Sequence, residues 1–140
     1  MNKDIIQFIR KQKTATVCTV DEQGNPYCFS CFYVFDEEKA ILIYKTHADS
    51  HHVPMMQVKK EVAGSILPGK ADPVIVRGIQ FEGIVIPSSD PSAVHASRDY
   101  HLRYPFALAM GGDIWVIRLQ HIKMTDSSKG FGTKIEWTRD

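Results

Sequence analysis

The sequence predicts a mainly β domain with short α-helices, a six-stranded antiparallel β-barrel. Three β-forming runs in the first third of the chain are separated only by short turns, which is typical of an antiparallel meander. A later run over 73–86 is long and rich in Val and Ile, and Gly78 and Gly83 would let such a strand bend. With 140 residues and 44% apolar content, the chain suits one domain over 1–140.

The first half is expected to contain a helix followed by three strands. Asn2 can cap a short helix with an apolar face, which we expect to cover the barrel. Strands are expected over 14–20, 27–35 and 40–45, joined by polar turns. The middle strand carries apolar side chains on both faces, so one face can join the core and the other needs a partner.

The second half is expected to alternate helices and strands. Ser50 is a candidate cap for a helix through Lys60, and strands should follow over 61–67 and 73–86. Asp90 or Ser92 can cap a third helix that reaches about Arg103. The sixth strand, 114–124, shifts its apolar alternation, which predicts a β-bulge near Gln120.

Charge and composition narrow the function classes. A net charge of +1 without a basic stripe disfavours binding to nucleic acid or to an anionic membrane. The absence of a signal peptide or a spanning apolar run predicts a cytoplasmic protein. Three cysteines fit a reducing compartment better than a disulfide framework. Cys28 and Cys31 have redox-motif spacing, but on a strand they point to opposite faces, so we expect apolar packing instead.

The segment 46–52 is a candidate anion site. The hydroxyls of Thr46 and Ser50 and the imidazoles of His51 and His52 could converge on a phosphate, although spacing alone favours ordinary capping. A metal site is disfavoured, because no cysteine or carboxylate pair recurs with ligand spacing. A hydrolase triad of Asp99, His101 and Ser97 or Ser92 can be written, but nothing in the spacing supports it.

Motifs over nearly the whole chain resemble those of one family, the pyridoxamine 5'-phosphate oxidase-like FMN-binding split barrels, and within it the bacterial YhbP-like subfamily. The resemblance implies a split barrel that forms a homodimer with FMN at the subunit interface, which agrees with a strand that is apolar on both faces. The matching motifs are Phe32-Tyr33-Val34-Phe35-Asp36, Ile75-x-Arg77-Gly78-x-Gln80-Phe81-x-Gly83, Arg103-Tyr104-Pro105, Trp115-x-Ile117-Arg118-Leu119, Ile122-Lys123-x-Thr125-Asp126, Gly130-Phe131-Gly132-x-Lys134 and Trp137-x-Arg139-Asp140.

The resemblance also implies which residues hold the FMN phosphate. Thr46 and Ser50 match hydroxyls that contact it, while His51 and His52 stand where the family usually has Arg and Lys. Histidine is only partly protonated at neutral pH, so FMN binding should be weaker and should weaken further as pH rises.

The other implied contacts concern the flavin ring. Ser30, Cys31 and Phe32 resemble the strand whose backbone lines the isoalloxazine ring. Gln80 resembles an amide that contacts the flavin, and Trp137 would approach from the partner subunit. Arg77 would pair with phosphate or with a tail carboxylate. Such a partner would also offset the cost of placing a charged side chain in a strand that we expect to be buried.

The resemblance leaves the substrate open, because the Arg-x-His pattern that binds substrate phosphate in the family is missing. It implies a flavin-dependent oxidoreductase acting on a small planar molecule, without a dedicated catalytic side chain because the flavin does the chemistry. Two alternatives stay open. One is a flavin, haem or tetrapyrrole-binding module without turnover, in which His47, His51 or His52 faces an iron, and the other is a dimer whose cofactor site has decayed.

Overall fold

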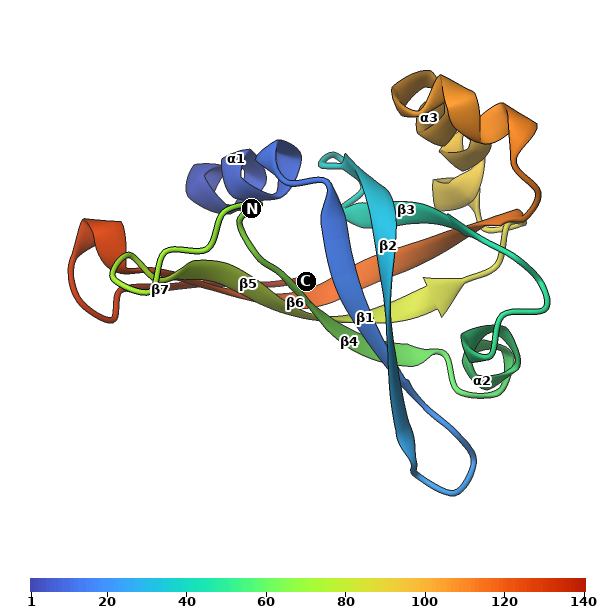
Figure 1. Ribbon diagram of the computed structural model, residues 1–140, viewed down its shortest axis with the longest axis horizontal. Helices are drawn as coiled ribbons and strands as arrows, with labels where there is room; N and C mark the ends of the chain where they lie inside the picture. Colours follow the sequence, from blue (N-terminus) through green and yellow to red (C-terminus); the bar gives the residue numbers. More distant parts are fainter.

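Seven strands form one antiparallel sheet, and six of them close into a barrel (Figure 1). The structure is a computed structural model that describes residues 1–140. The strand order is β3-β2-β1-β4-β5-β6-β7, and an additional pairing of β3 with β6 closes the ring. The predicted six-stranded antiparallel barrel is therefore confirmed, with β7 as an added edge strand.

The strands are β1 (Thr14–Val20), β2 (Pro26–Asp36), β3 (Ile41–Thr46), β4 (Glu61–Ile66), β5 (Arg77–Ile86), β6 (Asp113–Asp126) and β7 (Lys134–Thr138). The α-helices are α1 (Lys3–Lys11), α2 (His52–Val58) and α3 (Ala96–Arg103), and short 3-10 turns are η1 (Pro91–Ala93), η2 (Pro105–Ala109) and η3 (Ser127–Lys129). No helix is both long enough and apolar enough to cross a membrane.

The larger of two apolar cores fills the barrel, and α1 covers it as expected. Ile5, Phe8 and Ile9 of α1 are buried against the barrel interior. Asn2 caps the helix, since its side chain accepts a hydrogen bond from the Asp4 backbone N–H. Tyr33 Oη donates to the Ile9 carbonyl over 2.6 Å, which ties the end of α1 to β2.

The smaller core lies outside the barrel, between the β3–β6 seam and α3. Ile41, Ile43 and Val116 supply the sheet side, and Tyr100 and Tyr104 supply the helix side. Tyr104 Oη donates to the Tyr33 carbonyl over 2.9 Å, so the two cores are joined at β2. In Figure 1, α3 and α2 lie at the same end of the molecule, on either side of the outgoing end of β3.

The barrel bends where the sequence indicated. The register of β5 with β6 passes from Glu82–His121 to Gly83–Leu119, which leaves Gln120 as the extra residue of a β-bulge and confirms that prediction. At Gly83, a Cβ would lie 2.5 Å from Ile117 Cγ2, so glycine permits the close approach of the two strands.

Several element boundaries differ from the prediction. Ser50 does not cap α2, because the chain makes a turn there and the helix begins only at His52. The long strand begins at Arg77 rather than at residue 73, because the Asp72 carboxylate accepts from the backbone of Val74 and turns the chain. Asp90 caps only the short η1 turn, and α3 starts after it.

The cysteine prediction is partly wrong, because the structure contains a disulfide whereas the cysteine count was expected to fit a reducing compartment better than a disulfide framework. Cys18 and Cys28 occupy opposite positions in the β1–β2 register, with 4.2 Å between their Cα atoms, and they form a disulfide. Cys28 is exposed, so the expected apolar packing does not apply to it. Cys31 does not join the bond and packs against the barrel core, which confirms that Cys28 and Cys31 stay apart.

Candidate functional site

The sheet has an open edge along β2. Over Pro26–Phe32 this strand pairs with β1 alone, because β3 joins it only over Tyr33–Asp36. Over Pro26–Phe32, the other edge of β2 therefore has no neighbouring strand. Backbone N–H and C=O groups along such an edge are available to a ligand.

A cavity of about 240 Å³ lies against this edge. Its apolar wall combines aromatic and aliphatic side chains from β2, α3 and η2, and its polar rim comes from the ends of β2 and β3 and the start of α2. No carboxylate lines it. The lining residues are Phe29, Ser30, Cys31, Phe32, Lys45, Thr46, His47, His52, Tyr100, Phe106, Ala107, Met110 and Gly111.

Thr46, Ser50 and His52 form a hydrogen-bonded cluster at the polar rim. Thr46 Oγ1 is 2.8 Å from His52 Nε2 and 3.3 Å from Ser50 Oγ. The His52 ring also stacks on Phe29, with 3.6 Å between the ring centroids. Burial, with a further contribution from His51, lowers the pKa of His52, so its imidazole is neutral at neutral pH.

Lys45 is held on the other side of the rim. Its Nζ donates to the Ala107 carbonyl over 2.6 Å and lies 3.2 Å from His101 Nε2. An ammonium can only donate, so His101 Nε2 is the acceptor and the imidazole proton is on Nδ1. That Nδ1 donates to the Ser97 carbonyl over 2.8 Å, which fixes the imidazole against α3.

The structure brings together six of the predicted cofactor residues. Ser30, Cys31, Phe32, Thr46 and His52 line the cavity, and Ser50 adjoins it through Thr46.

Four predicted residues lie elsewhere. The His51 ring meets the edge of Tyr27, and Arg77 pairs with Asp126 over 3.3 Å and lies over the Phe8 ring. Gln80 is exposed on β5, and Trp137 of β7 lies under the guanidinium of Arg139. Arg77, Gln80 and Trp137 therefore do not reach the cavity within one subunit.

Sequence reasoning missed the wall formed by α3 and η2. Tyr100, Phe106 and Met110 line the cavity from positions far along the chain from β2, so no spacing rule could connect them. The signal available in the sequence was the apolar run that follows Pro105. In the structure this run stays open to solvent, with Phe106 64% and Met110 55% exposed. The Asp99, His101 and Ser97 combination is not a triad: Asp99 pairs with Arg98, and His101 is bound to Lys45.

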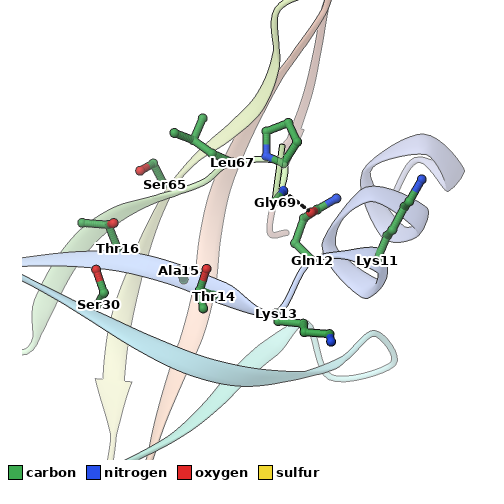
Figure 2. A pocket seen from close by; sticks show the side chains of 11 residues that line it. Lys11, Gln12, Lys13, Thr14, Ala15, Thr16, Ser30, Ser65, Leu67 and Gly69 are labelled. Carbon is green, nitrogen blue, oxygen red and sulfur yellow. Dashed lines mark hydrogen bonds between the residues drawn. The ribbon is translucent and has the colours of Figure 1, made fainter. Parts of the chain in front are cut away.

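A larger hollow of about 520 Å³ lies on the outer face of β1 and β4 near the end of α1 (Figure 2). Lysine side chains and small hydroxyls line it, and Gln12 Oε1 accepts from the Gly69 N–H across its mouth. Only Ser30 is shared with the cavity at the β2 edge. With few apolar side chains, this hollow suits a planar aromatic ligand less well than that cavity does.

The barrel and its interrupted edge place the protein in the class of split barrels, and solved structures share its fold. The haem-binding protein from Mycobacterium smegmatis matches with a TM-score of 0.77 and 14% identity, over 94% of this chain and 55% of that chain. A pyridoxamine 5'-phosphate oxidase-related, FMN-binding protein from Nostoc punctiforme matches with a TM-score of 0.67 and 12% identity, over 98% of this chain and 89% of that chain. At these identities the likeness concerns the fold.

Sequence relatives define the family. A UPF0306 protein of Serratia proteamaculans is 34% identical over 137 residues, which is 98% of this chain and 94% of the relative. A UPF0306 protein of Yersinia enterocolitica is 33% identical over 135 residues, 96% of this chain and 91% of the relative. The chain belongs to the UPF0306 family. No protein-family model matches it.

Proposed function

We propose that this protein binds FMN at the open edge of β2, as a homodimer, and uses it as a flavin-dependent oxidoreductase for a small planar molecule. The observation that supports this most strongly is the cavity itself, where an apolar wall and a carboxylate-free polar rim meet an unpaired strand edge. The FMN-binding neighbour of the same fold adds support. We also propose that the chain belongs to the YhbP-like subfamily and that the protein is located in the cytoplasm.

The residues present fit a flat, anionic cofactor. Phe32, Phe106 and Met110 offer apolar surface to a ring, and the β2 edge offers backbone groups to the polar atoms of that ring. Hydroxyls of Thr46 and Ser50 stand at the rim for a phosphate. His52 fits as a neutral hydrogen-bonding group, because its lowered pKa prevents it from acting as a permanent cation.

Bound FMN would supply the hydride chemistry. The side chains would bind the ring, orient it and exclude water, and no catalytic acid or nucleophile is required from this chain. The outer ring face would be the place where a planar substrate stacks.

A second copy of the chain would complete the site. Phe32 is 53% exposed beside the cavity, which leaves apolar surface that a partner subunit can cover. Gln80 and Trp137 lie away from the cavity of their own subunit, so they would act only on the partner's FMN. Arg77 is engaged by Asp126, and we assign it no contact with the phosphate.

The test is an absorption spectrum of gently purified protein followed by an FMN titration read as fluorescence quenching. We expect flavin bands or saturable quenching. The affinity should rise on acidification, because protonation of His52 adds positive charge at the polar rim of the cavity. A colourless protein that leaves FMN fluorescence unchanged at acidic and alkaline pH would contradict the proposal and favour a decayed cofactor site.

Haem is the second candidate, because His47 is exposed and lines the same cavity. A neutral imidazole facing a cleft is a suitable axial ligand. The structural neighbour from Mycobacterium smegmatis is described as haem-binding. Haem addition would then give a Soret band that is lost in His47→Ala and retained in His95→Ala, whose histidine lies outside the cavity.

A further inference from the structure

We infer that Lys45 is the residue that binds the anionic group of the cofactor, and that His101 positions it. The inference rests on the proposed function, since it names the charge partner within the same cavity. Lys45, the neighbour of Thr46 on β3, supplies the fixed positive charge that His51 and His52 do not supply.

The charge distribution around the cavity is the first argument. Lys45 is the only permanently charged residue among those that line it, and no aspartate or glutamate is present there. None of the ion pairs in the protein includes Lys45. A half-buried ammonium without a carboxylate partner attracts an anion more strongly than a solvated surface lysine does.

The hydrogen bonds of Lys45 are the second argument. The Ala107 carbonyl and His101 Nε2 use two of the three N–H donors, and both acceptors are neutral. One donor therefore remains for a ligand, and the full positive charge remains uncompensated. These two contacts also hold a flexible side chain in place, so less conformational entropy is lost when an anion binds.

His101 acts through Lys45 and is a positioning residue. Its Nδ1 is held by the Ser97 carbonyl, so the other nitrogen is directed at the Lys45 ammonium. His101 itself does not line the cavity. Loss of the His101 side chain should weaken the binding of the anion by Lys45, although the positive charge of Lys45 remains.

The anion is a phosphate monoester or a carboxylate attached to a planar ring, as in FMN or haem. FMN and riboflavin have the same isoalloxazine ring but differ in the phosphate, so the ratio of their dissociation constants isolates the contribution of the anion. Haem and its dimethyl ester make the same comparison for a carboxylate.

The experiment measures these ratios for the full-length wild type, Lys45→Gln, His101→Leu and a control, Lys134→Gln, which removes an exposed positive charge on β7. We expect wild type to prefer FMN over riboflavin by about tenfold or more, as suits a charge-assisted hydrogen bond. Lys45→Gln should lose most of that preference while riboflavin binding stays within about twofold. His101→Leu should be intermediate, and the control should match wild type.

Salt dependence gives a second measurement. Added salt should weaken FMN binding by wild type and have a smaller effect on Lys45→Gln. Unchanged riboflavin binding shows that a variant is folded. If a variant loses riboflavin binding too, the salt dependence of FMN binding is compared between wild type and Lys45→Arg, which keeps the charge. If FMN binding by wild type does not change with salt, the role of Lys45 is refuted.

The two proposals can fail separately. If wild type binds FMN and Lys45→Gln keeps the full preference, the role of Lys45 is refuted while FMN binding stands. If wild type binds neither flavin but prefers haem over its dimethyl ester in a Lys45-dependent way, the FMN proposal fails and the role of Lys45 stands. If it binds none of these ligands, both are refuted.

Discussion

The imidazole of His52 lies flat against the phenyl ring of Phe29, with an angle of 8° between the ring planes. This stack joins the first residue of α2 to the unpaired part of β2, and the contact with Thr46 adds the end of β3. One neutral ring thus connects three elements around the cavity. Its protonation state should therefore affect stability as well as ligand binding.

We predict that acid destabilises the protein through His52. Its pKa is lowered below the usual 6.5 in the folded state, so the unfolded chain takes up a proton first as pH falls. The stabilisation is present above pH 6.5 and is lost as pH falls through the folded pKa. Urea unfolding at about pH 7.5 and about pH 5 should show a larger loss for wild type than for His52→Gln. Equal losses would contradict the prediction.

The Arg77–Asp126 pair should stabilise the protein at neutral pH and lose its contribution in a more acidic range than His52 does. The Asp126 side chain is 1% exposed, and although burial opposes ionisation, hydrogen bonds from Ser128 and the charge of Arg77 lower its pKa. Its contribution is present above the usual aspartate pKa and is lost as pH falls through the folded value. Because Arg77 is 39% exposed, Arg77→Met should cost only about 1–2 kcal/mol at neutral pH. Chemical denaturation measures this loss, and Lys134→Met, which changes an exposed lysine on β7, should be nearly neutral.

Loss of the Cys18–Cys28 disulfide should destabilise the β1–β2 hairpin. The bond closes a loop with a sequence separation of 10, for which chain-entropy arguments give about 2–3 kcal/mol. The double variant Cys18→Ser with Cys28→Ser should unfold at a lower denaturant concentration than wild type. Reductant should shift the wild type midpoint to that of the double variant and leave the double variant unchanged. A midpoint that ignores reductant would contradict the prediction.

Gly64 should tolerate no side chain. A Cβ there would lie 2.3 Å from the Thr16 carbonyl oxygen and 2.3 Å from the Phe81 ring. Gly64→Ala should destabilise the protein by about 2–3 kcal/mol through overpacking of the barrel. Gly69→Ala is the matched control, because nothing lies within 4 Å of its Cβ position and the change should be neutral. Thermal melts of both variants would measure the difference.

Local patterns predicted the barrel well, because strand alternation and turn residues are properties of neighbouring positions. The bulge at Gln120 followed from a shift in alternation alone. β7 was missed because it is a five-residue edge strand that pairs only with β6 and has a weak apolar pattern. The disulfide was missed because the sequence analysis weighed only Cys28 and Cys31 as a pair, whereas the register of β1 with β2 places Cys18 opposite Cys28.

The candidate site was only partly predictable. Thr46 and His52 lie close in sequence, so a motif could join them. Lys45 stands beside Thr46 in that motif, but its role depends on His101 and Ala107, which only the tertiary fold brings to it. Arg77 was assigned to a ligand because its carboxylate partner, Asp126, lies on a different strand.

The barrel also depends on the far end of the sequence. Arg139 donates from Nε to the Leu119 carbonyl and from its terminal nitrogen to the carbonyls of Lys39 and Ala40. These contacts hold the β2–β3 turn against β6, where the ring of strands closes. During translation, residues 1–46 can form their meander early, but β3 has no partner for its second edge until β6, residues 113–126, has been made. The nascent chain therefore passes through a stage with an exposed sheet edge, when it is most prone to pair with other chains.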